Sequence, residues 1–349
     1  MTQDKVKQIK VWYKENEDIL DKMVIKLKST IEEILVAEKV PYSSVTSRKK
    51  NLQSLCNKAE KPKYVNPVEE IQDIVGIRIV AYVESDVEKI CKIIESSFDI
   101  DKENSEDKRT SLGIDKVGYR SVHYVVKIDE NRSKLQEYKL FKDLCFEIQV
   151  RTLLQHTWAE IEHDRNYKFS GTLPDEIKRK FSLIAGTLEL LDKQFDSIAN
   201  EMDEYTKDIS EKTKLGEIEG VNIDSTSLSQ YLITAFSEEI GSKIDPTFGF
   251  SGNDEMIIKE LKCFGIKNLK ELDKLVIKFK NKDLYENDED TFTGILRTYM
   301  MVEDSNKYFD KCWNHNWDGI NRELVNKMCK YNENIKNDLK TYKVDVITN

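Results

Sequence analysis

A short segment near the middle of the chain carries ionic side chains in a row. Residues 145–163 read CFEIQVRTLLQHTWAEIEH, in which a β-like alternation gives way to helical spacing. Within FEIQVRT, Glu147, Gln149 and Arg151 share one face of a strand and apolar side chains share the other. A strand that only covers a core usually turns small or neutral polar residues to water. A carboxylate, an amide and a guanidinium in a row therefore indicate a site for charged ligands.

A second β-like segment begins with an acidic residue. Residues 73–83 read DIVGIRIVAYV, with Asp73 at the start of the strand. Gly76 allows another group to approach the backbone closely. Arg78 is a lone charge among Val and Ile, and by itself it fits an edge-strand cation that points to water equally well.

A third β-like segment has polar residues of one parity. In GYRSVHYVVKI, residues 118–128, the side chains of Tyr119, Ser121 and His123 can all face one way. Alone, this pattern is typical of a half-buried strand with a polar outer face, and a lone His is more often structural than catalytic. Together with the two other β-like segments, however, this segment predicts a polar sheet face that spans three strands.

Asp73 and Glu147 together indicate a divalent-metal site. Mg²⁺ is commonly held by one or two carboxylates plus the phosphates of a substrate. The chain has no GxxxxGK[ST], GxGxxG or HExxH motif, so side chains must hold any phosphates. Suitable cations lie upstream, at what the sequence predicts to be a helix start: Arg48, Lys49, Lys50 and Lys58. These residues favour Mg²⁺-dependent transfer from a nucleotide over a purely structural role.

The elements that must position these residues follow from periodicity and breakers. We expect a loop that enters a helix at YSSVTSRKKNLQSLCNKAEK, and a charged, turn-like segment at 99–116. Helical spacing predicts helices at 5–39, SDVEKICKIIESSF, TLLQHTWAEIEHDRNYK and about 174–214. The order β, α, β, β, α predicts a mixed sheet with helices packed against it, in an α/β or α+β fold.

The C-terminal part of the chain has a different pattern. Residues 226–349 are Lys- and Asn-rich, mostly helical in spacing, and show no strong strand. We therefore expect an N-terminal helix (1–40), a central domain (41–215) and an all-helical C-terminal domain (216–349). The C-terminal domain could be regulatory, inhibitory or an oligomerisation module.

Three features of the C-terminal part have ordinary explanations. MIIKELKCFGIKNLKELDKLVI, residues 256–277, predicts two helices that turn at Gly265. Cys312 and His315 are spaced like two metal ligands, but no second close pair accompanies them, and a zinc site needs four. Trp313 and Trp317 are expected to pack in the core of this domain.

Composition bounds the classes of function. The chain has 349 residues, which suits two domains, and a net charge of −9, which disfavours non-specific coating of nucleic acid. Its N-terminus lacks the apolar region of a signal peptide, and no run approaches the ~18 apolar residues of a membrane helix, so we expect a cytoplasmic protein without membrane contact. Its six cysteines are scattered and form no CxxC pair, which indicates reduced thiols.

Five motifs in a fixed order resemble the synthetase domain of the RelA/SpoT family over about residues 41–210. They are SRKKNLQSLCNK, DIVGIR, GYRSVHY, EIQVRT and WAEIEHDRNYK. The resemblance implies a nucleotidyltransferase-like fold, a mixed sheet flanked by helices. It also implies an enzyme like the small alarmone synthetases, a GTP diphosphokinase of the stringent response. Such an enzyme would transfer pyrophosphate from ATP to the 3′-hydroxyl of GDP or GTP to make (p)ppGpp and AMP. We expect a synthetase-only enzyme, because the family's hydrolase domain with its His-Asp metal ligands would lie before the motifs and only about forty residues precede them.

The resemblance also implies roles for individual residues. Glu147 would activate the 3′-hydroxyl, Asp73 and Glu147 would hold Mg²⁺, and Gln149 and Arg151 would support them. Arg48 and Arg78 would sandwich the adenine, while Lys50, Lys58 and Ser54 would contact the ATP phosphates. The acceptor nucleotide would contact four residues: Tyr119, which stacks on its base, Ser121, His123 and His163.

Departures from the family pattern leave the acceptor open. Many members have an Asn two residues before the stacking Tyr and a Lys four before it, whereas this chain has Val117 and Asp115. One alternative is a toxic synthetase that pyrophosphorylates the 3′ end of tRNA, with the C-terminal domain as regulator or antitoxin. The other is a catalytically inactive nucleotide-binding module. The sequence also leaves a homo-oligomer open.

Overall fold

The computed structural model describes residues 2–107, 121–168, 174–240, 254–284, 291–315, 317 and 319–347. The chain divides into two compact units, Met1–Asn200 (unit 1) and Glu201–Asn349 (unit 2). The division falls inside helix α8 (Asp175–Leu215). The domain boundaries expected at 40/41 and 215/216 stay predictions.

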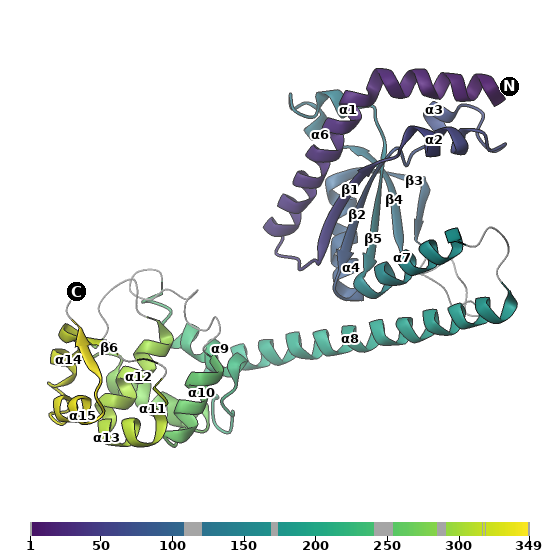
Figure 1. Cartoon of the computed structure of the whole chain (residues 1–349). Coiled ribbons are helices and arrows are strands. Elements are labelled where there is room, and N and C mark those ends of the chain that lie inside the picture. The colour runs from purple at the N-terminus through teal and green to yellow at the C-terminus, as the bar shows by residue number, and fades with distance from the viewer. Residues whose placement is uncertain are drawn as a thin grey trace. The chain divides into compact units, whose positions relative to one another are not determined.

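Unit 1 is built around one mixed sheet (Figure 1). Its strand order is β1-β2-β5-β4-β3. β2 and β5 are parallel, and the other neighbours are antiparallel. The strands are β1 (Ser44–Lys49), β2 (Val75–Ala81), β3 (Phe98–Asp107), β4 (Val122–Ile128) and β5 (Phe146–Thr152).

Helices supply the rest of the core of unit 1. Along α1, fully buried Ile9, Leu20, Met23, Leu27 and Ile31 recur at helical spacing, which explains why a highly charged sequence folds onto the sheet. The hydroxyl of Tyr124 on β4 donates to Glu95 of α4 at 2.7 Å, which places α4 on the apolar face. The described helices are α1 (Thr2–Ala37), α2 (Leu52–Ala59), α3 (Pro67–Glu70), α4 (Glu84–Ser97), α6 (Glu130–Ser133), the 3₁₀ turn η1 (Lys139–Phe141), α7 (Leu153–Lys168) and α8.

Two sequence expectations for unit 1 were wrong, and both concern edge strands. Residues 44–49 form β1 rather than a loop, and residues 98–107 form β3 rather than turns. Each lies at an edge of the sheet, where one side of the strand meets water and charged residues are common. β3 also has an irregular register between Asp101 and Glu106, which breaks the alternation that would reveal a strand.

Unit 2 has its own core and is mainly helical. The two-helix prediction is confirmed, with Gly265 at φ +93° between α10 and α11. Trp313 is buried in this core and Trp317 packs against it, as expected. The predicted helical character is confirmed, but the unit is not all-helical, because two three-residue strands pair in parallel. The described elements are α9 (Ser225–Ala235), α10 (Asp254–Cys263), α11 (Leu269–Phe279), α12 (Phe292–Glu303), α13 (Ser305–Lys307), the π-helical η2 (Tyr308–Cys312), β6 (Gly319–Asn321), α14 (Arg322–Met328), α15 (Ile335–Thr341) and β7 (Asp345–Ile347).

The predicted fold class is confirmed: a mixed sheet flanked by helices, followed by a mostly helical C-terminal unit. Within the described ranges, no helix is long and apolar enough to cross a membrane.

Candidate active site

Two transverse rows of residues cross the polar face of the sheet. In the first row, Arg78 on β2 lies opposite Gln149 on β5, which lies opposite His123 on β4. In the second row, Gly76 lies opposite Glu147. Directly opposed residues project to the same face. The three polar segments of the sequence therefore meet on neighbouring strands, as predicted.

Glu147 is held at both carboxylate oxygens. His123 Nδ1 donates to Oε1 at 2.9 Å and Gln149 Nε2 donates to Oε2 at 2.8 Å. The other ring nitrogen of His123 lies 2.7 Å from the hydroxyl of Ser121. Burial raises the pKa of Glu147, but the hydrogen bonds from His123 and Gln149 outweigh burial and leave the pKa below its usual value. Glu147 is therefore ionised and oriented at neutral pH.

Asp73 lies between two lysines just before β2. Lys50, which follows β1, and Lys58 on α2 both contact its Oδ2, Lys58 at 2.9 Å. Burial raises the pKa of Asp73, yet the two ammonium groups lower it below its usual value. The other oxygen, Oδ1, is buried and has no hydrogen-bond partner. A buried carboxylate oxygen without a hydrogen-bond partner is costly, so this oxygen is available to a cation or to a hydrogen-bond donor.

Arg48 lies over Gly76, its register partner on β2. A Cβ at Gly76 would come within 3.9 Å of Arg48 Cγ and 4.0 Å of Nε. The side chain of Arg48 is otherwise exposed. The glycine therefore leaves room for a guanidinium plane close to the sheet, beside Glu147.

A second charged cluster lies where β5 passes into α7. Arg78 Nη1 donates to Glu160 Oε1 at 2.8 Å, and Arg151 and His156 approach the same oxygen at 3.7 and 3.8 Å. Burial lowers the pKa of His156, and Arg151 and Arg78 lower it further, so this imidazole is neutral at pH 7. Sequence reasoning missed His156 and Glu160, although their i, i+4 spacing directly after a polar strand was a usable signal.

The remaining predicted residues are less central. Lys49 points away from Asp73 and pairs with Asp21 of α1 at 2.6 Å. The predicted basic helix start was wrong, since Arg48 and Lys49 belong to β1 and only Lys58 lies in α2. Ser54 is exposed in the first turn of α2, and its N–H donates to Asn51. His163 is exposed on α7. Tyr119, with Val117 and Asp115, lies outside the described residues.

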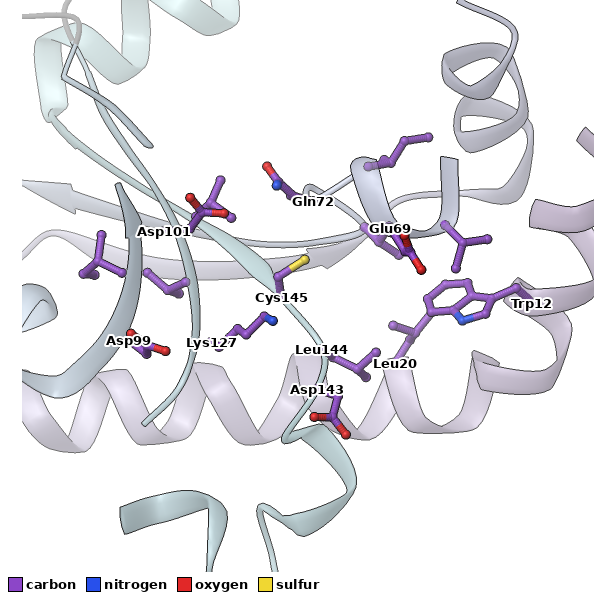
Figure 2. A pocket seen from close by; sticks show the side chains of 16 residues that line it. Trp12, Leu20, Glu69, Gln72, Asp99, Asp101, Lys127, Asp143, Leu144 and Cys145 are labelled. Carbon is purple, nitrogen blue, oxygen red and sulfur yellow. The ribbon is translucent and has the colours of Figure 1, made fainter. Parts of the chain in front are cut away.

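A cavity of about 620 Å³ borders the site (Figure 2). Cys145 precedes Glu147 by two residues and Val125 lies opposite Glu147, so the cavity adjoins the candidate base. In Figure 2, Cys145 lies between Trp12 and Asp101. The volume is within the range of small-molecule sites. Its charged lining is mostly acidic, which disfavours phosphate in this part of the site: Glu69, Asp99, Asp101, Asp143 and Lys127.

The carboxylate oxygens of Asp73 and Glu147 are of the kind that Mg²⁺ prefers as ligands. Among the described residues, no cluster of three or more His, Cys, Asp or Glu could hold a metal by itself. Mg²⁺ usually keeps several waters and takes one or two carboxylates plus substrate phosphates. The unpartnered Oδ1 of Asp73 offers a hard oxygen of that kind. The negative charge of Asp73 raises the pKa of Glu147, but the hydrogen bonds from His123 and Gln149 keep that pKa below its usual value.

The fold and the site define an α/β protein whose sheet carries an oriented carboxylate beside clustered cations. Comparison with known proteins gives the family. Residues 47–172 match the model described as "Region found in RelA / SpoT proteins". The chain is 32% identical over 179 residues to GTP pyrophosphokinase YjbM of Bacillus subtilis (strain 168), covering 51% of this chain and 81% of that protein. This chain belongs to the RelA/SpoT family.

Other relatives cover the same part of the chain. GTP pyrophosphokinase YwaC of Bacillus subtilis (strain 168) is 26% identical over 167 residues, which are 47% of this chain and 76% of that protein. The crystal structure of small alarmone synthetase 1 from Bacillus subtilis is 28% identical, with a TM-score of 0.47 over 55% of this chain and 98% of that one.

Proposed function

We propose that this chain is an ATP-dependent pyrophosphokinase that transfers the β,γ-pyrophosphate of ATP to the 3′-hydroxyl of GDP or GTP. The products are (p)ppGpp and AMP. Two relatives are named GTP pyrophosphokinases. The observation that carries the proposal is Glu147, held at both oxygens by His123 and Gln149 on the sheet face that also bears Arg48 and Arg78.

Glu147 is the proposed general base. Its carboxylate would accept the proton of the 3′-hydroxyl as that oxygen forms its bond to the β-phosphorus, while the bond from the β-phosphorus to the oxygen of AMP breaks. A positioned base of this kind is worth ~10²–10⁴-fold in rate. His123 and Gln149 fix the direction of the carboxylate, which holds the base in line with the reacting atoms.

The cations around the base have distinct proposed roles. Arg48 and Arg78 are planar and suit stacking on adenine, for which Arg78 would have to leave Glu160. Lys50 and Lys58 would exchange part of their contact with Asp73 for the phosphates of ATP. Asp73 Oδ1 and Glu147 would hold Mg²⁺, which supplies charge neutralisation for the transferred group when bound.

The acceptor can be decided directly. The protein is incubated with Mg²⁺ and ATP labelled at the γ-phosphate, with GDP, GTP or deacylated tRNA in turn. Label on GDP or GTP supports the proposal, whereas label on tRNA alone overturns it. Transfer to no acceptor, with ATP still bound, would make the chain a nucleotide-binding module. The tRNA arm is included because Lys178, Arg179 and Lys180 form an exposed basic patch at the start of α8.

A variant tests the base itself. Glu147→Gln keeps the shape of the side chain but cannot take a proton, so we expect transfer to fall by at least about a hundredfold while ATP binding persists. Glu95→Gln is the matched control, since Glu95 accepts from Tyr124 on the opposite face of the sheet. Full activity in Glu147→Gln would remove Glu147 from the mechanism.

A further inference from the structure

Two side chains of α7 lie beside Arg78 and have no role in the transfer proposed above. Glu160 accepts a hydrogen bond from Arg78 Nη1 at 2.8 Å. His156 lies one helical turn earlier, with its Nδ1 3.8 Å from the same oxygen of Glu160. This Nδ1 is buried and has no hydrogen-bond partner within the described residues. Both side chains are therefore available for another task at the nucleotide site.

The proposed reaction brings two different purine nucleotides to one protein. The donor, ATP, carries adenine, and the acceptor, GDP or GTP, carries guanine. Adenine has an amino group at position 6, which donates hydrogen bonds, whereas guanine has an oxygen there, which accepts them. Stacking does not tell the bases apart, because every base has a π face. Arg48 and Arg78 alone would therefore admit GTP as a donor, and another group must read the edge of the base.

Three polar side chains near Arg78 differ in what they can read. Thr46, the register partner of Arg78 on β1, has a hydroxyl that can donate or accept and therefore fits either base. Gln149, the partner on β5, already donates its amide to Glu147. Glu160 has a carboxylate, which accepts hydrogen bonds and cannot donate them. Of these three, the carboxylate is the group that pairs with a 6-amino group and repels a 6-oxo group.

We propose that Glu160 selects the donor nucleotide by accepting a hydrogen bond from the 6-amino group of adenine, and that His156 donates to N1 beside it. This inference rests on the proposed function, in which adenine stacks on Arg78. When Arg78 turns to the base, Glu160 loses a hydrogen-bond donor, and the amino group of adenine replaces that donor. Guanine offers an oxygen at this position, so the carboxylate would be left without a donor and next to a like partial charge.

His156 is suited to the second position of the edge. Its imidazole is neutral, because burial and then the charges of Arg151 and Arg78 lower its pKa. A neutral imidazole has one N–H donor and one acceptor nitrogen. The N–H can donate to N1 of adenine, which is an acceptor. Glu160 and His156 together present an acceptor and a donor, which is the complement of the adenine edge.

A buried cation keeps Glu160 in place when Arg78 leaves it. Arg151 Nη2 lies 3.7 Å from Glu160 Oε1, and the side chain of Arg151 is only 4% exposed. Arg151 belongs to β5, so its position does not depend on the nucleotide. The side chain of Glu160 is itself 58% exposed. A carboxylate that is held by a fixed cation and is still accessible suits recognition of the edge of a base.

Donor choice can be measured apart from acceptor choice through the monophosphate that is released. With Mg²⁺ and GDP, ATP as donor releases AMP, and inosine triphosphate (ITP), which has an oxygen at position 6, releases IMP. We expect kcat/KM for ATP to exceed that for ITP at least about a hundredfold in the parent. In Glu160→Gln this ratio should fall at least about tenfold, because a Gln side chain can also donate to a 6-oxo group.

The ratio compares two donors on one protein, so a loss of folded or active enzyme does not change it. Glu162→Gln is the matched control. It removes a negative charge from the same helix, but residues two apart on a helix do not share a face. The ratio should stay at its parent value in this variant.

A binding measurement tests His156 and needs no transfer. Labelled α,β-methylene-ATP, which cannot transfer pyrophosphate, marks the donor site, and unlabelled nucleotides compete with it. The analogue 1-deaza-ATP lacks the acceptor at N1, so it should compete about tenfold less well than ATP in the parent and equally well in His156→Phe. The same tenfold loss in both proteins would remove His156 from the recognition of adenine.

The same competition separates this inference from the proposed function. ATP should compete at least about tenfold better than ITP in the parent, and this preference should shrink in Glu160→Gln. Transfer to no acceptor with this binding pattern intact would overturn the proposed function alone. A preference for ATP that Glu160→Gln leaves unchanged, in binding and in transfer, would overturn the assignment of Glu160. A donor site from which ATP displaces no label would overturn both.

Discussion

Glu147 and Asp192 are both carboxylates of unit 1, yet their surroundings move their pKa values in opposite directions. Glu147 receives two hydrogen bonds, and its pKa falls. Asp192, on α8, is almost fully buried and receives one hydrogen bond, from Thr152 at 2.7 Å. Burial, with smaller contributions from the nearby Glu84 and Asp196, raises the pKa of Asp192 to about 6 despite the hydrogen bond from Thr152. The surroundings of Glu147 therefore favour its charged form, whereas the burial of Asp192 disfavours the charged form and lowers the stability of the fold.

The raised pKa of Asp192 predicts that the stability of unit 1 depends on pH. Its carboxyl ionises near pH 4 in the unfolded chain but at about 6 in the folded one. The folded state therefore binds the proton more tightly, and stability falls as pH rises from about 4 to about 6. Asp192→Asn removes this loss, so at pH 7.5 it should raise the free energy of unfolding of unit 1 by about 1–3 kcal/mol.

Denaturant unfolding at pH 4.5 and pH 7.5 checks this prediction. The stabilisation by Asp192→Asn should shrink at the lower pH, because the parent carboxyl is then protonated. Asp203→Asn, at an exposed position of the same helix, is the control. A variant that is equally or less stable than the parent at pH 7.5 would show that Asp192 is stabilised by contacts that the amide loses.

At the scale of elements, the register between β1 and β2 sets how close Arg48 comes to the sheet. Gly76 leaves ordinary contact distance for one added carbon. We therefore expect Gly76→Ala to retain activity. Gly76→Val should displace the Arg48 side chain and raise the KM for ATP about tenfold with little loss of stability, since Val suits a strand. Steady-state kinetics with varied ATP concentration checks this prediction. Equal KM values for ATP in the two variants would show that the position of Arg48 does not affect ATP binding.

The central strands of the sheet and their polar residues could be predicted from the sequence, whereas the two edge strands could not. β2, β4 and β5 alternate regularly because one face is buried, so Asp73, Glu147 and His123 could be placed together in advance. The edge strands β1 and β3 lack that constraint. His156 and Glu160 were missed for a different reason, since their contact with Arg78 depends on how α7 leaves the sheet. Periodicity does not define that direction.

At the scale of the whole molecule, the two hydrophobic cores share no residue in the described ranges. We therefore expect two unfolding transitions, one for each unit, rather than one cooperative step. Fluorescence can separate them, because Trp12 and Trp158 lie in unit 1, and Trp313 and Trp317 lie in unit 2.

The measurement uses Trp313→Phe with Trp317→Phe, which leaves only the unit 1 reporters, and compares it with far-ultraviolet circular dichroism of the same variant. Fluorescence should follow one of two dichroism transitions. A single coincident transition by both probes would show that α8 couples the units into one folding domain.

The charged edges of the sheet have a consequence for the behaviour of the protein at high concentration. β3 ends the sheet with a bulged, mostly acidic strand, and β1 ends it with Arg48 and with Lys49 tied to α1. A strand of a neighbouring molecule that paired with either edge would have to bury these charges. At β3 it would also have to pair with a strand whose hydrogen-bond pattern is irregular. Stocks of the folded enzyme should therefore resist fibril growth, and shaking at neutral pH should yield no thioflavin-positive material as long as unit 1 stays folded.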